Sequence, residues 1–224
     1  MLIAFEGMDG CGKSTISKKV ANSLGINHET QKITRLLDID NNKYNAFIKE
    51  IRKSNNKKLA LIFYTFRCML DKDSTCDVIV ERSMISTYFY EHEKVSDKEF
   101  NYLLTLDCIP DITFILYASS DERKKRIELR DCNDEDLKSK EALSDGYKEM
   151  LDCVKNYHIP YIGINTENYN VDEIVDICTD IICKLKKINY KDRIEYIECM
   201  NDYYGFENMY KERNLKLIWI IVMI

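Results

Sequence analysis

A glycine-rich segment near the start of the chain constrains its fold more than any other feature. Residues 7–15 read Gly-Met-Asp-Gly-Cys-Gly-Lys-Ser-Thr, which matches the phosphate-binding loop pattern G-x-x-x-x-G-K-S. The apolar run Leu2–Phe5 precedes this segment, and an apolar pattern typical of a helix begins after it at Ile16. A strand, a phosphate loop and a helix in this order predict an α/β fold built on a parallel sheet.

The residues of this loop indicate how a nucleotide would be bound. Glycines let backbone N–H groups curl around phosphate oxygens, and the positive end of the following helix adds to the attraction. Lys13 would reach the β- and γ-phosphates, and Ser14 would offer its hydroxyl to Mg²⁺, which prefers oxygen ligands. We therefore expect ATP to contact Gly7, Asp9, Gly10, Cys11, Gly12, Lys13, Ser14 and Thr15.

Charge and cysteine content disfavour several other classes of protein. The 33 basic and 38 acidic residues are interspersed and give a net charge of −5, so no basic field favours a nucleic-acid partner. Nine scattered cysteines without a C-x-x-C pair disfavour a disulfide framework or structural zinc and fit a reducing cytoplasm. No signal peptide precedes the first strand, and the apolar segment Leu217–Ile224 is far shorter than the ~20 residues of a membrane-spanning helix. We expect a cytoplasmic protein with no membrane partner, whose apolar end forms a strand or a packed tail.

Apolar runs and helical spacing alternate along the rest of the chain. Strand-like runs recur at Leu2–Phe5, Val78–Val80, Ile112–Tyr117 and Tyr161–Ile164, with a further strand expected within Ile26–Ile39. Helical patterns lie at Leu59–Leu70, Ser83–Glu91, Asp97–Leu106, Asp121–Arg130, Lys138–Tyr157 and Val171–Leu185. This alternation predicts a doubly wound parallel sheet that is flanked by helices on both faces.

The length of 224 residues fits one α/β domain. With two prolines, seven glycines and no low-complexity linker, the weakest candidate for a boundary lies near Lys186–Asn189. We expect one domain over residues 1–187. A carboxyl-terminal extension over residues 188–224, helical from Tyr190 to Arg213, is expected to pack on the same domain.

Several motifs, taken in order, resemble those of the thymidylate kinases. The segment Phe5–Thr15 is similar to the family's opening F-E-G-x-D-G-x-G-K-S-T, with Asp9 at the position of its internal aspartate. The family's L-L-F-x-x-x-R helix, D-R-Y-x-x-S segment, P-D-x-T strand start and R-I-x-x-R stretch resemble Leu61–Arg67, Glu81–Ser86, Pro110–Thr113 and Arg123–Arg130. The resemblance covers about residues 1–187. It implies a P-loop nucleotide kinase fold with a lid at about residues 130–140, and a homodimer.

Three departures from the family pattern leave other activities open. Glu81 replaces the family's aspartate, and Glu-Arg-Ser is similar to the deoxynucleoside kinases, which phosphorylate nucleosides. The family's T-R-E-P-G-G acceptor loop survives at most as Thr34-Arg35. The lid Asp131–Asp136 is acidic where relatives carry an arginine, so the nearest cationic substitutes are Arg130, Lys138 and Lys140.

Phosphoryl transfer depends mainly on positioning and charge neutralisation, so cations should converge on one place. Arg82 directly follows the predicted strand Val78–Val80, at the carboxyl end of the sheet, where open α/β folds bind ligands. Its guanidinium would clamp the acceptor and the transferred phosphate bidentately. Glu81, which ends the same strand, would hold Mg²⁺ through water or accept the acceptor's proton.

Phe63 and Arg67 lie four residues apart on one predicted helix, so they share a face that suits a planar base. The spacing alone fits a core position for Phe63 equally well, and the family resemblance favours binding. By the same resemblance, Asp9 accepts a hydrogen bond from the sugar 3′-hydroxyl of the acceptor. The remaining acceptor-binding residues are predicted to be Arg35, Arg82, Ser86 and Tyr90.

A basic helix precedes the predicted lid. Arg123, Arg126 and Arg130 fall at i, i+3 and i+7 and therefore share one face. We expect Arg126 and Arg130 to reach the donor phosphates as the lid closes, whereas Arg123 receives no separate role. Cys11 is interpreted as a filler residue, and the three histidines have no spacing that suggests metal binding or nucleophilic catalysis.

Together, the motifs and the resemblance predict transfer of the γ-phosphoryl group of Mg·ATP to a deoxynucleoside monophosphate, with dTMP as the leading acceptor. The predicted catalytic residues are Lys13, Glu81, Arg82, Arg126 and Arg130, and the predicted Mg²⁺ ligands are Ser14 and Glu81. A deoxynucleoside kinase and a catalytically weak nucleotide-binding protein are the alternatives.

Overall fold

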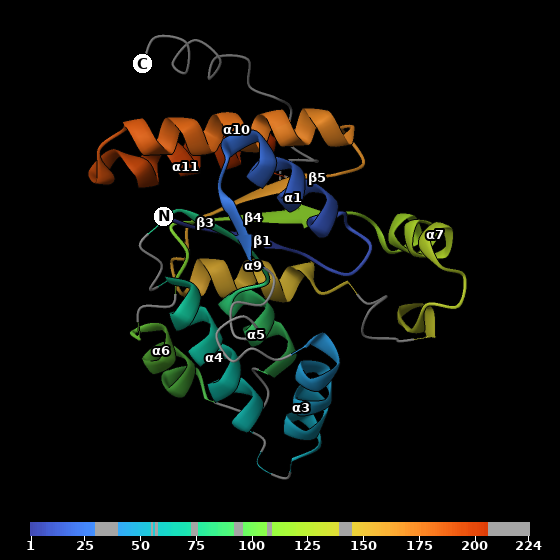
Figure 1. Cartoon of the computed structure of the whole chain (residues 1–224). Coiled ribbons are helices and arrows are strands. Elements are labelled where there is room, and N and C mark those ends of the chain that lie inside the picture. The colour runs from blue at the N-terminus through green and yellow to red at the C-terminus, as the bar shows by residue number, and fades with distance from the viewer. Residues whose placement is uncertain are drawn as a thin grey trace.

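Five strands form one all-parallel sheet in the order β2-β3-β1-β4-β5. The fold comes from a computed structural model (Figure 1), which describes residues 1–29, 40–54, 56, 58–72, 76–91, 96–106, 109–138 and 145–205. The strands are β1 Leu2–Glu6, β2 Asn27–Glu29, β3 Val78–Glu81, β4 Ile112–Tyr117 and β5 Tyr161–Asn165. The predicted doubly wound parallel sheet is confirmed, and β2 lies at the start of the range in which a further strand was expected.

Helices cover both faces of the sheet (Figure 1). One face carries α1 Lys13–Leu24, α10 Val171–Lys187 and α11 Tyr190–Tyr204. The other carries α4 Leu59–Lys72, α5 Met84–Glu91 and α9 Tyr147–Asn156, with α3 Asn41–Lys53 and α6 Asp97–Leu104 packed outside them. Beyond the carboxyl ends of the strands lie α7 Ser120–Arg130 and the 3₁₀ helix η2 Glu135–Lys138.

Strand side chains alternate between two cores, one on each face of the sheet. Ile3 and Phe5 of β1 pack with residues of α1, α10 and α11, and the Phe5 ring stacks on that of Phe114 with 5.1 Å between centroids. Ile115 of β4 instead packs with residues of α5 and α9. Because the central strands β1 and β4 are covered on both faces, nearly all their residues are buried, which explains their continuous apolar sequence.

The helix α11 covers the edge strand β5. The Oδ1 atom of Asn201 accepts a hydrogen bond from the backbone N of Gly163 at 2.9 Å. Ile197 and Met200 of the same helix join the core on the α1 and α10 face. The predicted helix that begins at Tyr190 is therefore present, but it ends at Tyr204, with Gly205 as its carboxyl-terminal cap, and does not run on unbroken to Arg213. Residues 206–224, which include the apolar segment 217–224, lie outside the described residues.

Two helix predictions need correction. The helix expected over Lys138–Tyr157 is too long, because Lys138 ends η2 and α9 begins only at Tyr147. The residue before α9, Gly146, packs so tightly that an added Cβ would lie 2.4 Å from the Phe89 ring. The helix α3 was not predicted, although its buried residues Tyr44, Ile48 and Ile51 are spaced as one apolar helix face. Across the described part of the chain, no helix combines the length and apolarity that a membrane span requires.

Candidate functional site

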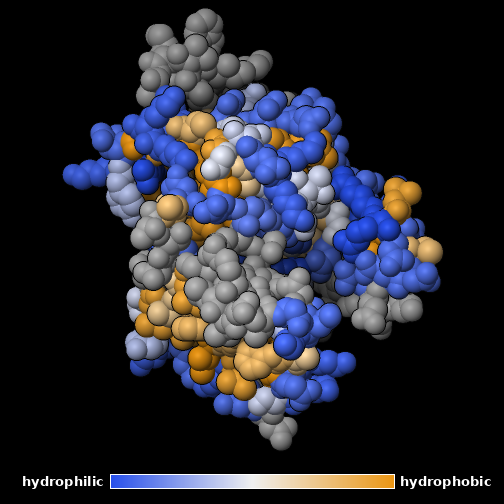
Figure 2. Space-filling view, in the orientation of Figure 1, coloured by the Kyte–Doolittle hydropathy of each residue, from blue (hydrophilic) through white to orange (hydrophobic). Residues whose placement is uncertain are grey.

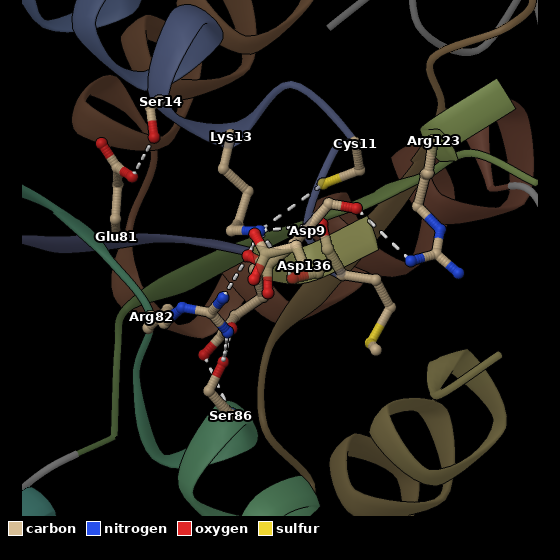
Figure 3. A network of polar contacts seen from close by, with 12 residues as sticks. Asp9, Cys11, Lys13, Ser14, Glu81, Arg82, Ser86, Arg123 and Asp136 are labelled. Carbon is tan, nitrogen blue, oxygen red and sulfur yellow. Dashed lines mark hydrogen bonds and ion pairs between the residues drawn. The ribbon is translucent and has the colours of Figure 1, made fainter. Parts of the chain in front are cut away.

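The loop between β1 and α1 encloses the side chain of Lys13 (Figure 3). Lys13 is only 7% exposed, and its Nζ donates hydrogen bonds to the carbonyl oxygens of Gly7 and Met8 at 2.8 and 2.9 Å. The same Nζ lies 3.7 Å from Oδ1 of Asp9. The loop therefore holds the ammonium of Lys13 in a fixed position, where it would contact an anion bound in the loop.

The helix α1 begins at this loop without a side-chain cap. Its N-cap residue is Gly12, with a φ of 99°, and among the described residues no side-chain hydrogen bond caps this end of the helix. The first N–H groups of a helix have no partner within the helix, and the helix dipole makes this end positive. The start of α1 is thus suited to bind the phosphate oxygens of a ligand.

Gly7 is the position at which the loop has least room for a side chain. Its φ is 134°, and an added Cβ would lie 2.3 Å from the carbonyl oxygen of Leu116. Gly25, at the end of α1, also has a positive φ of 62°, but an added Cβ there would meet nothing within 4 Å.

Comparing alanine substitutions at these glycines tests this difference in crowding. Gly25→Ala should lower the free energy of unfolding by about 1–2 kcal/mol, the usual cost of a left-handed alanine. Gly7→Ala should cost more, because a backbone clash adds to the same strain. Urea denaturation of the two variants measures both losses, and equal losses would show that the Leu116 contact imposes no constraint.

Arg82 brings a second cation to the same place (Figure 3). It directly follows β3 and has a left-handed backbone with a φ of 67°, which is rare and strained for a residue with a side chain. Its Nη2 lies 2.5 Å from Oδ1 of Asp9, and its guanidinium lies over the ring of Tyr90, 5.6 Å from the centroid. Lys13 and Arg82 therefore share Asp9 as a counter-ion.

These charges shift one another's pKa. Burial acts to raise the pKa of Asp9, but the charges of Arg82 and Lys13 outweigh burial and lower it. Burial acts to lower the pKa of Arg82, but Asp9 and Tyr90 outweigh burial and raise it. Asp9 is thus ionised and Arg82 protonated throughout the neutral pH range. Together with Lys13, these residues carry an excess of positive charge.

Glu81, the last residue of β3, faces the start of α1 (Figure 3). The Ser14 hydroxyl donates to its Oε2 at 2.5 Å, and the Ser17 hydroxyl donates to its Oε1 at 3.3 Å. Nε2 of His28 lies 3.2 Å from the same Oε1. His28, which received no role from the sequence, therefore helps to fix the position of Glu81.

The pair Ser14 and Glu81 has the chemistry of a partial Mg²⁺ site. Both offer oxygen atoms, which Mg²⁺ prefers, and they lie at the edge of the loop that suits phosphate. Among the described residues, no three His, Cys, Asp or Glu side chains are grouped so that they could hold a metal ion. A cation bound at this pair would therefore share its coordination with the phosphates of a ligand and with water.

The pH dependence of stability tests the contacts of Glu81. Burial acts to raise its pKa, but hydrogen bonds from His28 and Ser14 outweigh burial and bring the pKa below 4.5. Because the folded-state pKa is depressed, Glu81 stabilises the fold above pH 4.5, and this contribution is lost as the pH falls through the folded-state pKa. Glu81→Gln should thus destabilise the protein at neutral pH and have a smaller effect in acid. Chemical denaturation at both pH values measures the difference, and an equal effect at both would contradict the assignment.

A fully buried carboxylate lies beside Arg82, at the end of β1. Glu6 accepts hydrogen bonds from the backbone N and the hydroxyl of Ser83, at 2.5 and 2.8 Å. It accepts two more from the backbone N and the hydroxyl of Ser86, at 3.1 and 2.5 Å. Glu6 was not predicted to be a site residue, although an acidic residue that ends an apolar run directly before a phosphate loop is a signal that could have been used. Ser86, predicted to contact the acceptor, also lies with its Oγ 3.4 Å from Nη1 of Arg82.

The arginines of α7 differ in their surroundings, although the sequence places them on one face. Arg123 is fully buried, and its Nη1 donates to the carbonyl oxygen of Asp9 at 3.3 Å (Figure 3). Its backbone lies so close to Gly10 that an added Cβ on the glycine would be 2.8 Å from the Arg123 carbonyl oxygen. Arg123 therefore supports the loop from α7, a role that the surface-like spacing of its helix did not indicate.

Arg126 and Arg130 make contacts away from Asp9. Arg126 donates from Nη1 to the hydroxyl of Thr166 at 2.8 Å and from Nε to Glu122 at 2.9 Å. Arg130 pairs with Asp134 and lies 3.7 Å from Oδ2 of Asp136. Their predicted contacts with donor phosphates would require these partners to be exchanged. The other candidate cations of the lid are not placed, because Lys140 and the side chain of Lys138 lie outside the described residues.

The two residues of α4 that were predicted to bind the base, Phe63 and Arg67, lie in different environments. Phe63 packs edge-on against the rings of Phe47 and Tyr64, with 5.4 and 5.6 Å between centroids. Arg67 donates from Nη2 to the carbonyl oxygen of Arg82 at 3.2 Å. Arg67 therefore joins the cluster around Arg82, whereas Phe63 belongs to an aromatic cluster between α3 and α4. Arg35 lies outside the described residues.

The family model and the relatives that match this sequence carry the same family description. The family model described as thymidylate kinase matches residues 5–176. A probable thymidylate kinase of Methanococcus maripaludis is 28% identical over 200 residues, which cover 83% of this chain and 97% of the relative. A thymidylate kinase of Mycoplasma capricolum is 26% identical over 215 residues, which cover 85% of this chain and 98% of the relative.

Solved structures resemble this chain in fold. A deoxyadenosine kinase from M. mycoides, with dCMP and dCDP bound, superimposes with a TM-score of 0.55 and 21% identity, covering 84% of this chain and 100% of its own. A thymidylate kinase from Ehrlichia chaffeensis superimposes with a TM-score of 0.54 and 20% identity, covering 81% of this chain and 97% of its own. At this identity the likeness supports the fold alone.

Proposed function

Because this chain belongs to the thymidylate kinase family, we propose that it transfers the γ-phosphoryl group of Mg·ATP to dTMP, giving dTDP. The observation that carries the proposal is the convergence of Lys13 and Arg82 on Asp9, at the carboxyl end of a parallel sheet. Neutralising the charge of the transferring group is the main task of a protein in phosphoryl transfer. The choice of dTMP is supported by relatives that are named thymidylate kinase and match this chain over nearly their whole length.

On the donor side, the proposed ATP phosphates lie in the loop over residues 7–15. Backbone N–H groups at the start of α1 and the ammonium of Lys13 bind their oxygens. Ser14 and Glu81 would hold Mg²⁺, which supplies further neutralisation of phosphate charge, and the alternative role of Glu81 is to accept the acceptor's proton. Arg126 and Arg130 are proposed to turn from their acidic partners to the donor phosphates as the lid closes.

On the acceptor side, Arg82 is proposed to bind the phosphate of the monophosphate, and Asp9 to accept the hydrogen bond of the sugar 3′-hydroxyl. Arg67 and Tyr90 are proposed to line the same site, which is supported by their contacts with the Arg82 carbonyl and guanidinium. Phe63 is proposed to stack on the base. In this structure, the Phe63 ring packs edge-on against Phe47 of α3.

A panel of acceptors tests the proposed function. Purified protein is mixed with Mg·ATP and, separately, dTMP, dUMP, thymidine or deoxyadenosine, and ADP release is followed. We expect release with dTMP and little with either nucleoside. Release with a nucleoside but not with dTMP would identify a deoxynucleoside kinase instead. Binding of ATP with no release for any acceptor would identify a nucleotide-binding protein that lacks this activity.

The extent of the functional unit is also proposed. Residues 1–187 form the kinase domain, and residues 188–224 form an extension that packs on it, which is supported by Ile197 and Met200 in the core. A reducing cytoplasm is the proposed location, supported by the absence of disulfides among the eight cysteines that the structure describes.

A homodimer is proposed on the basis of an exposed apolar surface. Ile62 and Phe66 of α4 are 54% and 48% exposed, and Tyr102 of α6 is 66% exposed. Figure 2 shows hydrophobic side chains over the lower part of the molecule, where α4 and α6 lie in Figure 1. A second copy packed there would remove this surface from water.

Sedimentation equilibrium tests the dimer against the chain mass of 26.5 kDa. The protein should sediment as twice this mass, and Ile62→Glu combined with Phe66→Glu should sediment as a monomer. Leu129→Glu, at a position of α7 that is 87% exposed, is the matched control and should leave the dimer intact. A monomeric wild-type protein would reject the dimer.

A further inference from the structure

The hydrogen bonds of Glu6 connect the end of β1 to the segment that carries Arg82. We propose that Glu6 is a positioning residue, which sets the Arg82 guanidinium for phosphoryl transfer by orienting the hydroxyl of Ser86. This inference rests on the proposed function and assigns two residues to it. Glu6 received no role from the sequence, and Ser86 is moved from the acceptor pocket to the support of Arg82.

The surroundings of Glu6 match those of an ionised carboxylate. It is fully buried, and each of its four hydrogen bonds comes from a donor of Ser83 or Ser86. An ionised carboxylate only accepts, and a buried one is costly unless such donors surround it. The two backbone donors also lie at the start of α5, where the helix dipole favours a negative charge. Glu6 therefore ties residues 83–86 to the strand that leads into the phosphate loop.

The direction of the Ser86 hydroxyl links Glu6 to the Arg82 side chain. Because its proton is donated to Oε2 of Glu6, its lone pairs are free to accept from Nη1 of Arg82 at 3.4 Å. The Ser83 hydroxyl makes the same donation to Glu6 at 2.8 Å. Of these two hydroxyls, that of Ser86 is the one with a contact to the Arg82 side chain among the described residues.

Arg82 needs such support because its ion-pair partner, Asp9, has a second task. Asp9 holds Nη2 at 2.5 Å, but in the proposed reaction this carboxylate also accepts from the acceptor's sugar. The link from Glu6 through Ser86 would keep Nη1 in place when Asp9 contacts the substrate.

Kinetics of single and double variants test the inference. Glu6→Gln and Ser86→Ala should each lower kcat by up to about 10²-fold, the cost of a small misplacement of a reacting group, with the KM for ATP nearly unchanged. Ser83→Ala is the matched control, since it removes an equally buried hydroxyl bond to Glu6 but no contact with Arg82. In an Arg82→Gln background, Glu6→Gln and Ser86→Ala should cause no further loss of kcat, because the residue through which they act is absent.

A second measurement does not depend on turnover. In NMR spectra of protein labelled in its arginine side chains, the Arg82 guanidinium should be more mobile in Glu6→Gln and Ser86→Ala than in wild type or Ser83→Ala. If wild type phosphorylates dTMP but Ser86→Ala equals Ser83→Ala in kcat and in the spectrum, Glu6 only caps α5 and the inference is wrong. If wild type phosphorylates no acceptor, the proposed function fails, and the spectra alone decide whether Glu6 orders Arg82.

Discussion

Replacing Arg82 with glutamine should lower kcat for phosphoryl transfer by about 10³-fold or more, the effect seen when an arginine that neutralises the transferred phosphoryl group is removed. The substitution removes a charge that lies 2.5 Å from Asp9 and leaves that carboxylate with Lys13 as its only strong partner among the residues placed here. In the proposed reaction, the negative charge of Asp9 would then be less neutralised where the phosphoryl group is transferred. Steady-state kinetics with saturating Mg·ATP and dTMP measure the loss.

Other substitutions at Arg82 separate its charge from its backbone strain. Arg82→Lys keeps the charge but loses the planar fork, so it should recover only part of the activity. Arg82→Gly should be as inactive as Arg82→Gln yet more stable than it by about 1 kcal/mol, because glycine adopts a φ of 67° without strain. Thermal and urea denaturation measure that difference. Activity near wild type in Arg82→Gln would place the catalytic cation elsewhere.

Replacing Lys13 with methionine should abolish tight ATP binding and lower kcat by about 10²–10³-fold, as when a single preorganised donor to the reacting group is lost. The effect has two parts. The ammonium proposed to bind the donor phosphates is gone, and the carbonyl oxygens of Gly7 and Met8 lose the donor that holds the loop closed. Calorimetric titration with ATP and kinetics with dTMP measure the two parts separately.

Lys19→Met is the matched control, because Lys19 lies on the same helix α1 and also pairs with an aspartate, Asp172, at 2.7 Å. Its side chain is 49% exposed, so the pair is screened by water and is worth at most about 1 kcal/mol to stability. This variant should bind ATP and turn over dTMP as wild type does. A similar loss in both variants would mean that charge on α1 in general, and not Lys13 in the loop, supports activity.

Elements that have a local sequence signal could be predicted from the sequence alone. The strands β1, β3, β4 and β5 are apolar runs that a sheet covered on both faces requires, and the glycines and Lys13 form one contiguous motif. The strand β2, with the sequence Asn-His-Glu, carries no such signal. It is a strand because it pairs with β3, which no local pattern reveals.

The parts of the site that escaped prediction depend on contacts between distant segments. Glu6 meets its serines across 77 to 80 positions of the chain, and Arg123 meets the Asp9 carbonyl across 114. The spacing i, i+3 and i+7 puts Arg123, Arg126 and Arg130 on one face of a helix, although only Arg123 is fully buried. Periodicity places a residue on a face of a helix, but the packing of whole elements decides what that face meets.

The side-chain amide of Asn201 also affects whether folded molecules can associate through the edges of their sheets. An uncovered edge strand can recruit the strand of a neighbouring molecule and begin aggregation. By occupying the Gly163 N–H of β5 from α11, the Asn201 side chain denies that hydrogen bond to any incoming strand. The helix α11 thus covers this part of the sheet edge, and removing it would leave the N–H of Gly163 open to a strand from another copy of the chain.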